Sequence, residues 1–306
     1  VRKVLAEIGA SVDDTVFVSG IGCAARFPYY ISTYGFHTIH GRAPGFATGI
    51  KLANPDLDVW VVSGDGDALS IGGNHFIHML RRNVNIQFLL FNNAIYGLTK
   101  GQYSPTTKPG ARTPSSPMGS IEMPLSACVL ALGANGTFVA RAIDTAQKHL
   151  PEVLKRAHEH AGTSMLEILQ NCNVFNDKAW EYATSRKSKA DTTLELEHGK
   201  PLIFGEDGNK GIRLNGLDPE VVELGKGITE DDLLFHDERS PEPSLAYLLS
   251  RMRYEDGFPE PIGVFRSVDA PSYDSLTNDQ IEEATRIKGI GDLESLYTTG
   301  ETWIVT

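Results

Sequence analysis

The sequence lacks the features that mark several large classes of protein. Its three cysteines, Cys23, Cys128 and Cys172, are too few among 306 residues for a disulfide scaffold. No apolar run approaches the ~18 residues that cross a bilayer, and the first residues lack the apolar segment and cleavage site of a signal peptide. The formal net charge is −11 and no basic stripe occurs, which disfavours nucleic acid as a partner. These absences predict a cytoplasmic protein that binds neither a membrane nor nucleic acid.

The first part of the sequence contains alternating strand and helix patterns. Residues 59–62 are a short apolar strand, typical of a parallel sheet with both faces covered. With the helix and strand that follow, they form a unit that implies a right-handed crossover. We therefore predict an α/β fold with a doubly wound, mostly parallel sheet. The expected strands are 15–18, 59–62, 86–91, 137–141 and 164–169, and the expected helices are 68–82, 126–132 and 144–161, the last with Asp144 as N-cap.

Two segments depart from this alternation. Residues 100–124 contain five prolines and many small polar residues, and so long a loop in a compact domain is usually functional or mobile. Residues 178–306 carry many charges, prolines and glycines with weak periodicity. We interpret them as a long irregular C-terminal extension that packs on the core or on a partner subunit.

The strongest site pattern is Gly-Asp-Gly-Asp at 64–67, with Asn93 following the next strand. Both segments fall at the carboxyl ends of neighbouring strands, where open α/β sheets bind ligands. The glycines allow a ligand close to the backbone, and the start of the following helix suits a diphosphate. Asp65 and Asn93, with the carbonyl of Ile95, offer the oxygen ligands that Mg²⁺ requires. The alternative is a surface turn at 64–67 with Asn93 as a cap.

Four segments narrow the interpretation to one family. These segments resemble the beta subunit of 2-oxoacid:ferredoxin oxidoreductases, and their amino-acid sequences are most similar to those of the bacterial enzymes that act on 2-oxoglutarate. The segments are residues 19–26, 38–43, 63–75 and 95–102. The resemblance implies thiamine diphosphate, Mg²⁺ and a [4Fe–4S] cluster as cofactors. It also implies coenzyme A as a substrate, ferredoxin and an alpha subunit as partners, and an (alpha-beta)2 assembly. Residues 1–177 would then form the domain that binds the diphosphate and Mg²⁺.

The same resemblance implies a reaction and leaves alternatives open. The expected reaction converts 2-oxoglutarate and coenzyme A reversibly into succinyl-CoA and CO₂, and passes electrons through the cluster to ferredoxin. A subunit specific for pyruvate or for several 2-oxoacids, a thiamine diphosphate decarboxylase without the cluster, and a non-catalytic phosphate-binding module are the alternatives. The cofactor-binding residues implied by the resemblance are Ile21, Gly22, Cys23, His40, Gly64, Asp65, Gly66, Asp67, Asn93, Ile95, Gly97, Leu98 and Thr99.

Cys23 and Cys172 follow two predicted strands, and by resemblance they are two of the four thiolate ligands of the cluster. The family's other pair is a Cys-x-x-Cys before the first helix, and the sequence starts after that point. We expect that pair to lie outside the sequence given, the alternative being a member without its cluster. Buried inert thiols are the alternative for both cysteines, and we predict that Cys128 only packs in the core.

Two further residues are candidates for catalysis. Arg26 could grip a carboxylate of the substrate with two parallel hydrogen bonds, although a surface ion pair would equally explain an arginine there. By resemblance His40 lies near the cofactor, where it would bond the substrate or move a proton; a structural histidine is the alternative. We expect His158 and His160 to be solvated, since residues two apart on a helix point in different directions.

Overall fold

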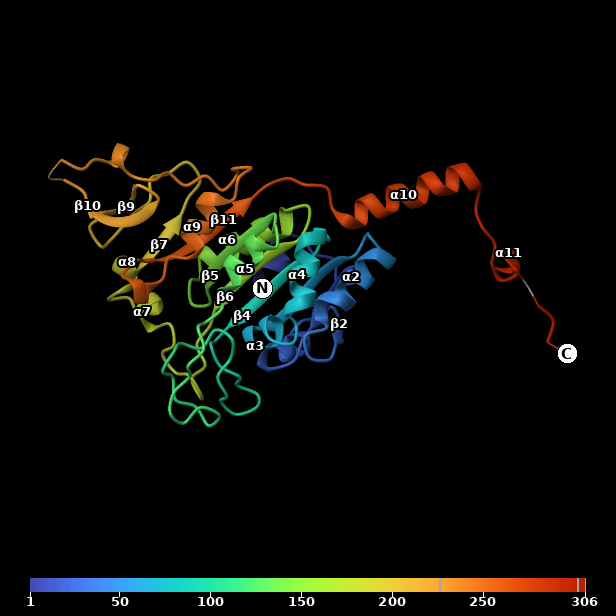
Figure 1. The fold of residues 1–306 in the computed structure, drawn as a ribbon, viewed down its shortest axis with the longest axis horizontal. Coiled ribbons are helices and arrows are strands. Elements are labelled where there is room, and N and C mark those ends of the chain that lie inside the picture. Colours follow the sequence, from blue (N-terminus) through green and yellow to red (C-terminus); the bar gives the residue numbers. More distant parts are fainter. Residues whose placement is uncertain (226, 302, 306) are drawn as a thin grey trace.

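The computed structural model describes residues 1–306 except 226, 302 and 306. Its main sheet has eight strands in the order β2-β1-β3-β4-β6-β5-β11-β7, and each pair is parallel except β11 with β5 (Figure 1). The elements up to residue 169 are α1 Arg2–Glu7, β1 Thr15–Ser19, the 3-10 helix η1 Cys23–Tyr30, β2 Tyr34–His37, α2 Ala43–Ala53, β3 Asp58–Gly64, α3 Asp65–Leu69, α4 Gly73–Arg82, β4 Gln87–Asn92, α5 Ala127–Gly133, β5 Phe138–Ile143, α6 His149–Glu159 and β6 Ser164–Leu169.

Helices cover both faces of this sheet, as predicted for a doubly wound α/β fold. On one face, side chains of β1, β3 and β4 pack against α2, α4, α5 and α9. On the other, the alternate side chains of the same strands, Phe17, Trp60 and Leu89, pack against α1 and α6. Because successive side chains of a strand point to opposite faces, continuously apolar strands can serve both layers. All five predicted strands are present.

Two predicted helices differ from the structure. The helix expected over 68–82 is divided into α3 and α4, because the chain turns at Gly72 and packs against Gly41. A Cβ at Gly72 would lie only 2.5 Å from the carbonyl oxygen of Asp67. The helix expected over 144–161 is shorter, and its N-cap is Lys148 instead of Asp144. Pro151 explains the later start, since proline is tolerated only in the first turn of a helix.

The interpretation of 178–306 as irregular is wrong for much of that segment. β7 and β11 belong to the main sheet, and β8, β9 and β10 form a small antiparallel sheet. The boundary at residue 177 stays a prediction. The elements are α7 Glu181–Thr184, α8 Lys189–Thr192, β7 Thr193–Leu196, β8 Ile203–Phe204, β9 Lys210–Asn215, β10 Asp218–Glu223, η2 Glu230–Asp232, α9 Ser244–Ser250, η3 Tyr254–Asp256, β11 Glu260–Ser267, α10 Tyr273–Lys288 and α11 Leu293–Thr298.

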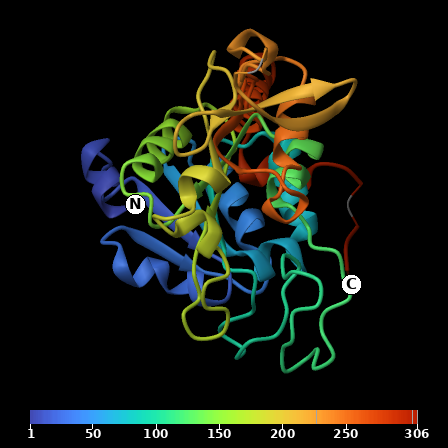
Figure 2. The same cartoon turned by 90° about the vertical axis from the view of Figure 1, so that its left-hand side faces the viewer.

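Two parts of the chain extend from the body. The segment between β4 and α5, which contains the proline-rich loop, projects beyond the carboxyl edge of the sheet (Figure 2). At the other end, α10 and α11 lead away from the sheet (Figure 1). Among the described residues, no helix combines the length and the apolar character needed to cross a membrane.

Candidate functional site

A cavity of about 440 Å³ lies at the carboxyl edge of β1, β3 and β4, where the sheet order reverses direction. Such a switch point is the usual ligand site of an open α/β sheet. All thirteen residues that sequence reasoning gave to the cofactor lie around this cavity, and their role in binding stays a prediction. The lining also includes Ala24, Ile71, Phe91, Tyr96, Gln102 and Gln170.

Gly66 brings the backbone of the Gly-Asp-Gly segment to the cavity wall. A Cβ at this position would lie 2.2 Å from the ring of Tyr96, so no other residue fits without rearrangement. The Tyr96 hydroxyl also donates a hydrogen bond to the Gly66 carbonyl at 3.0 Å. Tyr96 therefore fixes the path of the segment that contains Asp65.

Asp65 is a buried carboxylate, with 2% of its surface exposed, in the lining of the cavity. Its Oδ2 accepts hydrogen bonds from the hydroxyls of Ser104 and Thr106, at 2.5 and 2.7 Å. Backbone N–H groups of Asn93 and Gly66 also donate to it. Burial raises the pKa of Asp65 above its usual value in spite of these hydrogen bonds. No lysine, arginine or histidine in the described part of the chain forms a salt bridge with it.

The other predicted oxygen ligands lie on the adjacent turn. The backbone hydrogen bond from Asn93 to Asp65 places the two residues side by side, and the Asn93 side-chain oxygen accepts from the backbone of Ile95 at 3.3 Å. All three residues line the cavity. Oxygen donors of a carboxylate, an amide and a carbonyl form a set that fits Mg²⁺.

Asp67, whose part in cofactor binding stays a prediction, also makes hydrogen bonds that shape the site. Its two carboxylate oxygens accept from the Ser63 hydroxyl at 2.7 Å and from the Gly41 backbone at 2.8 Å. A Cβ at Gly20 would lie 2.0 Å from Asp67 Oδ2. Asp67 therefore ties the ends of β1 and β3 to the turn that follows His40, and His40 reaches the cavity wall next to this turn.

Cys23 and Cys172 come together although their strands are not neighbours in the sheet. A Cβ at Gly97 would lie 3.3 Å from the sulfur of Cys23 and 3.7 Å from that of Cys172. Gly97 thus leaves room beside two sulfur atoms at the cavity. Among the described residues, no group of three or more His, Cys, Asp or Glu side chains could hold a metal ion. The described residues bring two thiols together here, and their role as cluster ligands stays a prediction.

Arg26 is placed outside the cavity lining. It is exposed on η1, and its guanidinium lies 5.9 Å from the centre of the Tyr30 ring. In the chain alone, the Arg26 guanidinium is not part of the cavity lining.

Cys128 is fully buried in the core, as predicted. The expectation of solvated histidines on α6 and beyond is wrong for His160. It is buried and its Nε2 lies 2.8 Å from the Thr137 hydroxyl. His158 is partly covered by Trp60, whose ring it stacks on at 5.9 Å. The short α6 ends before His160, so helical spacing could not predict its direction.

Ser104 and Thr106 are site residues that sequence reasoning missed. Both belong to the proline-rich loop, whose length alone suggested a function. The useful signal was Ser-Pro-Thr-Thr at 104–107, three hydroxyls in a segment that must return to the edge of the sheet.

Comparison with known proteins agrees with this geometry. A family model described as thiamine pyrophosphate enzyme, C-terminal TPP binding domain, matches residues 20–168, and the α/β fold of the chain agrees with this match. The 2-oxoglutarate oxidoreductase subunit KorB of Mycobacterium tuberculosis is 46% identical over 307 residues, covering 100% of this chain and 82% of the relative. The chain belongs to the family of 2-oxoacid:ferredoxin oxidoreductase beta subunits.

Two further relatives support this membership. A 2-oxoacid:ferredoxin oxidoreductase subunit beta of Sulfolobus sp is 44% identical over 252 residues, covering 81% of this chain and 83% of the relative. A solved structure of 2-oxoglutarate:ferredoxin oxidoreductase from Magnetococcus marinus, with 2-oxoglutarate, coenzyme A and succinyl-CoA bound, superposes with a TM-score of 0.72. It is 31% identical, and the match covers 96% of this chain and 84% of that chain.

Proposed function

We propose that this chain, with an alpha subunit, catalyses the oxidative decarboxylation of 2-oxoglutarate. The reaction consumes 2-oxoglutarate, coenzyme A and two oxidised ferredoxins that each accept one electron, and it yields succinyl-CoA, CO₂, a proton and two reduced ferredoxins. The observation that carries this proposal is the burial of the Asp65 carboxylate in the cavity lining next to Gly66. Among the described residues, no cationic side chain forms an ion pair with it. The names of the mycobacterial relative and the Magnetococcus structure favour 2-oxoglutarate as the substrate.

In this proposal Asp65, Asn93 and the Ile95 carbonyl hold Mg²⁺, which binds the diphosphate of thiamine diphosphate. The backbone of Gly66, Gly97 and neighbouring residues lines the diphosphate, and the thiazolium of the bound cofactor supplies the electron sink for decarboxylation. Oxygen donors at a desolvated site are the ligands that Mg²⁺ requires. The protein contributes position and electrostatics around the reacting carbon.

Cys23 and Cys172 supply two thiolates to a [4Fe–4S] cluster beside the cofactor. The proximity of both sulfur atoms to Gly97 supports this pairing. A cluster of this kind needs four ligands, so two further thiolates must come from outside the residues described.

The alpha subunit covers the mouth of the cavity and completes the cofactor site in an (alpha-beta)2 assembly. Large exposed apolar side chains occur on segments that line this cavity or adjoin its lining, and two of them, Ile71 and Leu98, belong to the lining itself, which supports an interface here. His40, on the cavity wall, would bond the substrate or move its proton, and Arg26 would reach a substrate carboxylate only in the assembled site. The exposed side chains are Tyr29, Tyr34, Phe36, Ile39, Phe46, Ile71 and Leu98.

The decisive experiment is an anaerobic assay of the purified complex of this chain with its alpha subunit. We expect ferredoxin reduction that requires thiamine diphosphate, Mg²⁺ and coenzyme A, with the highest kcat/KM for 2-oxoglutarate among several 2-oxoacids. A higher kcat/KM for pyruvate would replace the substrate assignment. Decarboxylation without ferredoxin reduction in an iron-loaded complex would favour a decarboxylase, and absence of cofactor binding would refute the proposal.

A further inference from the structure

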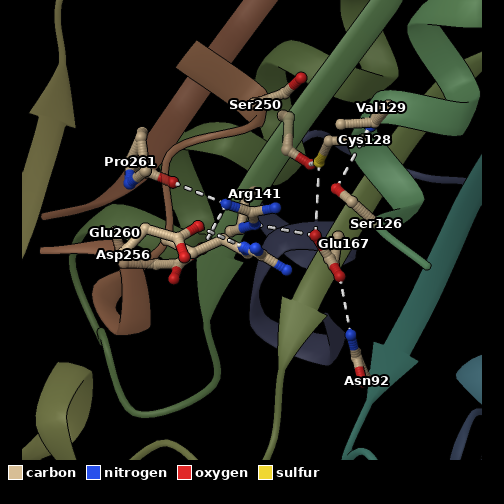
Figure 3. A network of polar contacts seen from close by, with 12 residues as sticks. Asn92, Ser126, Cys128, Val129, Arg141, Glu167, Ser250, Asp256, Glu260 and Pro261 are labelled. Carbon is tan, nitrogen blue, oxygen red and sulfur yellow. Dashed lines mark hydrogen bonds and ion pairs between the residues drawn. The ribbon is translucent and has the colours of Figure 1, made fainter. Parts of the chain in front are cut away.

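A second cavity of about 390 Å³ is lined in part by a buried polar network, which Figure 3 shows. Arg141, on β5, forms ion pairs with Glu167 on β6 and with Glu260 on β11. The nitrogen Nε of Arg141 lies 2.8 Å from Glu167 Oε2. All three side chains are buried, and the single guanidinium pairs with both carboxylates.

The network continues from Glu167 toward the first cavity. The other oxygen of Glu167 accepts a hydrogen bond from the Asn92 amide nitrogen at 2.8 Å. This bond fixes the orientation of the amide, whose oxygen then faces the hydroxyl of Thr106 at 2.9 Å. The Thr106 hydroxyl is also 2.7 Å from Asp65 Oδ2. Polar contacts thus run without a break from the ion pair to the proposed metal ligand.

The two cavities meet at these contacts. Asn92 and Thr106 line the second cavity, while Asp65 lines the first. Asn92 is 3% exposed, and its amide nitrogen donates a hydrogen bond to Glu167. Asn92 therefore lines the second cavity, whereas the next residue, Asn93, lines the first.

We propose that Glu167, Asn92 and Thr106 are positioning residues that hold the Asp65 carboxylate in the orientation required by the diphosphate-bound cation. This inference rests on the proposed function, because it presumes that Asp65 binds Mg²⁺. A hydroxyl has one proton, so Thr106 can donate to Asp65 or to Asn92 but not to both at once. The negative charge of Asp65 and the shorter distance make Asp65 the acceptor. The Asn92 oxygen, which Glu167 keeps turned toward Thr106, limits where the Thr106 hydroxyl can lie.

Outer hydrogen bonds of this kind orient metal ligands, and their loss typically weakens metal binding by about 10- to 100-fold. The test uses the complete complex with its alpha subunit, depleted of metal and supplied with excess thiamine diphosphate. Mg²⁺ binding is measured by calorimetric titration, and kcat is measured at saturating Mg²⁺. We expect Thr106→Val to weaken Mg²⁺ binding by about 10- to 100-fold, with a much smaller change in kcat at saturating metal.

Two variants separate positioning from general stability. Thr106→Ser keeps the hydroxyl and should bind Mg²⁺ within about twofold of the natural protein, because the donor remains. Thr163→Val makes the same change at a buried threonine whose hydroxyl donates to the Val84 carbonyl at 2.6 Å, before the start of β6. We expect it to lower the melting temperature while Mg²⁺ affinity stays unchanged.

Glu167→Gln tests the far end of the network. It should change the Mg²⁺ affinity of the natural complex, and it should change that affinity little further in a Thr106→Val background, because it acts on Asp65 only through the Thr106 hydroxyl. Normal Mg²⁺ affinity in Thr106→Val, an equal loss in Thr163→Val, or additive effects would each overturn the inference. If the natural complex binds no Mg²⁺ with thiamine diphosphate, the proposed function itself fails.

Discussion

Asp65 and Glu167 are two carboxylates with the same exposed fraction, 2%, and opposite electrostatic surroundings. Burial raises the pKa of Asp65, and its hydrogen bonds only partly offset this effect. Burial would also raise the pKa of Glu167, but the charge of Arg141 and hydrogen bonds from Asn92, Arg141 and Cys128 lower it below the usual value. The charge of Glu167 is therefore balanced inside the chain, whereas that of Asp65 is not.

This difference separates a structural carboxylate from a functional one. An unpaired buried charge costs free energy in the folded chain, and it persists where an external ion compensates it. Hydroxyl and backbone N–H groups donate hydrogen bonds to Asp65, whereas a guanidinium forms an ion pair with Glu167. We expect removal of the two carboxylates to have opposite consequences for activity and for stability.

Removal of the Asp65 carboxylate should have the largest effect on activity. We expect Asp65→Ala to reduce ferredoxin reduction by the complex to background and to abolish Mg²⁺-dependent binding of thiamine diphosphate, because the cation loses its only charged ligand in the chain. Calorimetry and the 2-oxoglutarate assay measure the two effects. Circular dichroism should show the fold unchanged. Activity close to that of the natural complex would refute the metal assignment.

The cysteines offer the same contrast between the first cavity and the buried network around Glu167. Cys23 lies at the cofactor cavity, while the Cys128 thiol lies 3.3 Å from Glu167 Oε2. We expect Cys23→Ala to lower the iron content and ferredoxin reduction of the anaerobic complex while thiamine diphosphate still binds, because the cluster loses a thiolate. Cys128→Ala is the control and should keep its iron. Equal iron in both variants would exclude Cys23 as a ligand.

Loss of the guanidinium in the second network should act on stability. Arg141→Met leaves Glu167 and Glu260 buried without a counter-charge, and breaking a buried ion pair in this way costs about 3–5 kcal/mol. Urea unfolding of the full chain measures the free energy of unfolding. Arg213→Met is a matched control, because its ion pair with Glu220 on the small sheet is partly exposed. An equal loss of unfolding free energy in both variants would show that the buried ion pairs stabilise the fold no more than the exposed one.

The sequence predicted more of the residues that line the cavity than of the loop and strands around them. Gly-Asp-Gly and Asn93 follow apolar strands, so the geometry of a parallel sheet brings them together whatever the rest of the chain does. Ser104 and Thr106 could not be assigned in advance, because a loop with many prolines has no periodicity from which to predict a direction. The strand Glu260–Ser267 was missed since Pro261 and Gly263 disfavour a strand, yet it lies between β5 and β7 in the main sheet.

The same contrast predicts opposite responses of stability to pH. A carboxyl group whose pKa is raised by folding favours the folded state when protonated, so this contribution is lost as pH rises from the usual range of Asp through the raised pKa. Asp65→Asn cannot ionise, and its oxygen can still accept from Ser104 and Thr106. Without metal and cofactor, we expect this variant to be more stable than the natural chain at neutral pH by about 0.5–2 kcal/mol.

The gain should shrink toward acid pH, where Asp65 itself becomes protonated, and should vanish when Mg²⁺ and thiamine diphosphate stabilise the natural complex. Glu167→Gln provides the opposite case, because the lowered pKa of Glu167 stabilises the fold above the usual range of Glu and is lost as pH falls. Urea unfolding curves at several pH values compare the two variants. If Asp65→Asn destabilises the metal-free chain at neutral pH, the buried charge of Asp65 is compensated inside the protein and the contrast with Glu167 fails.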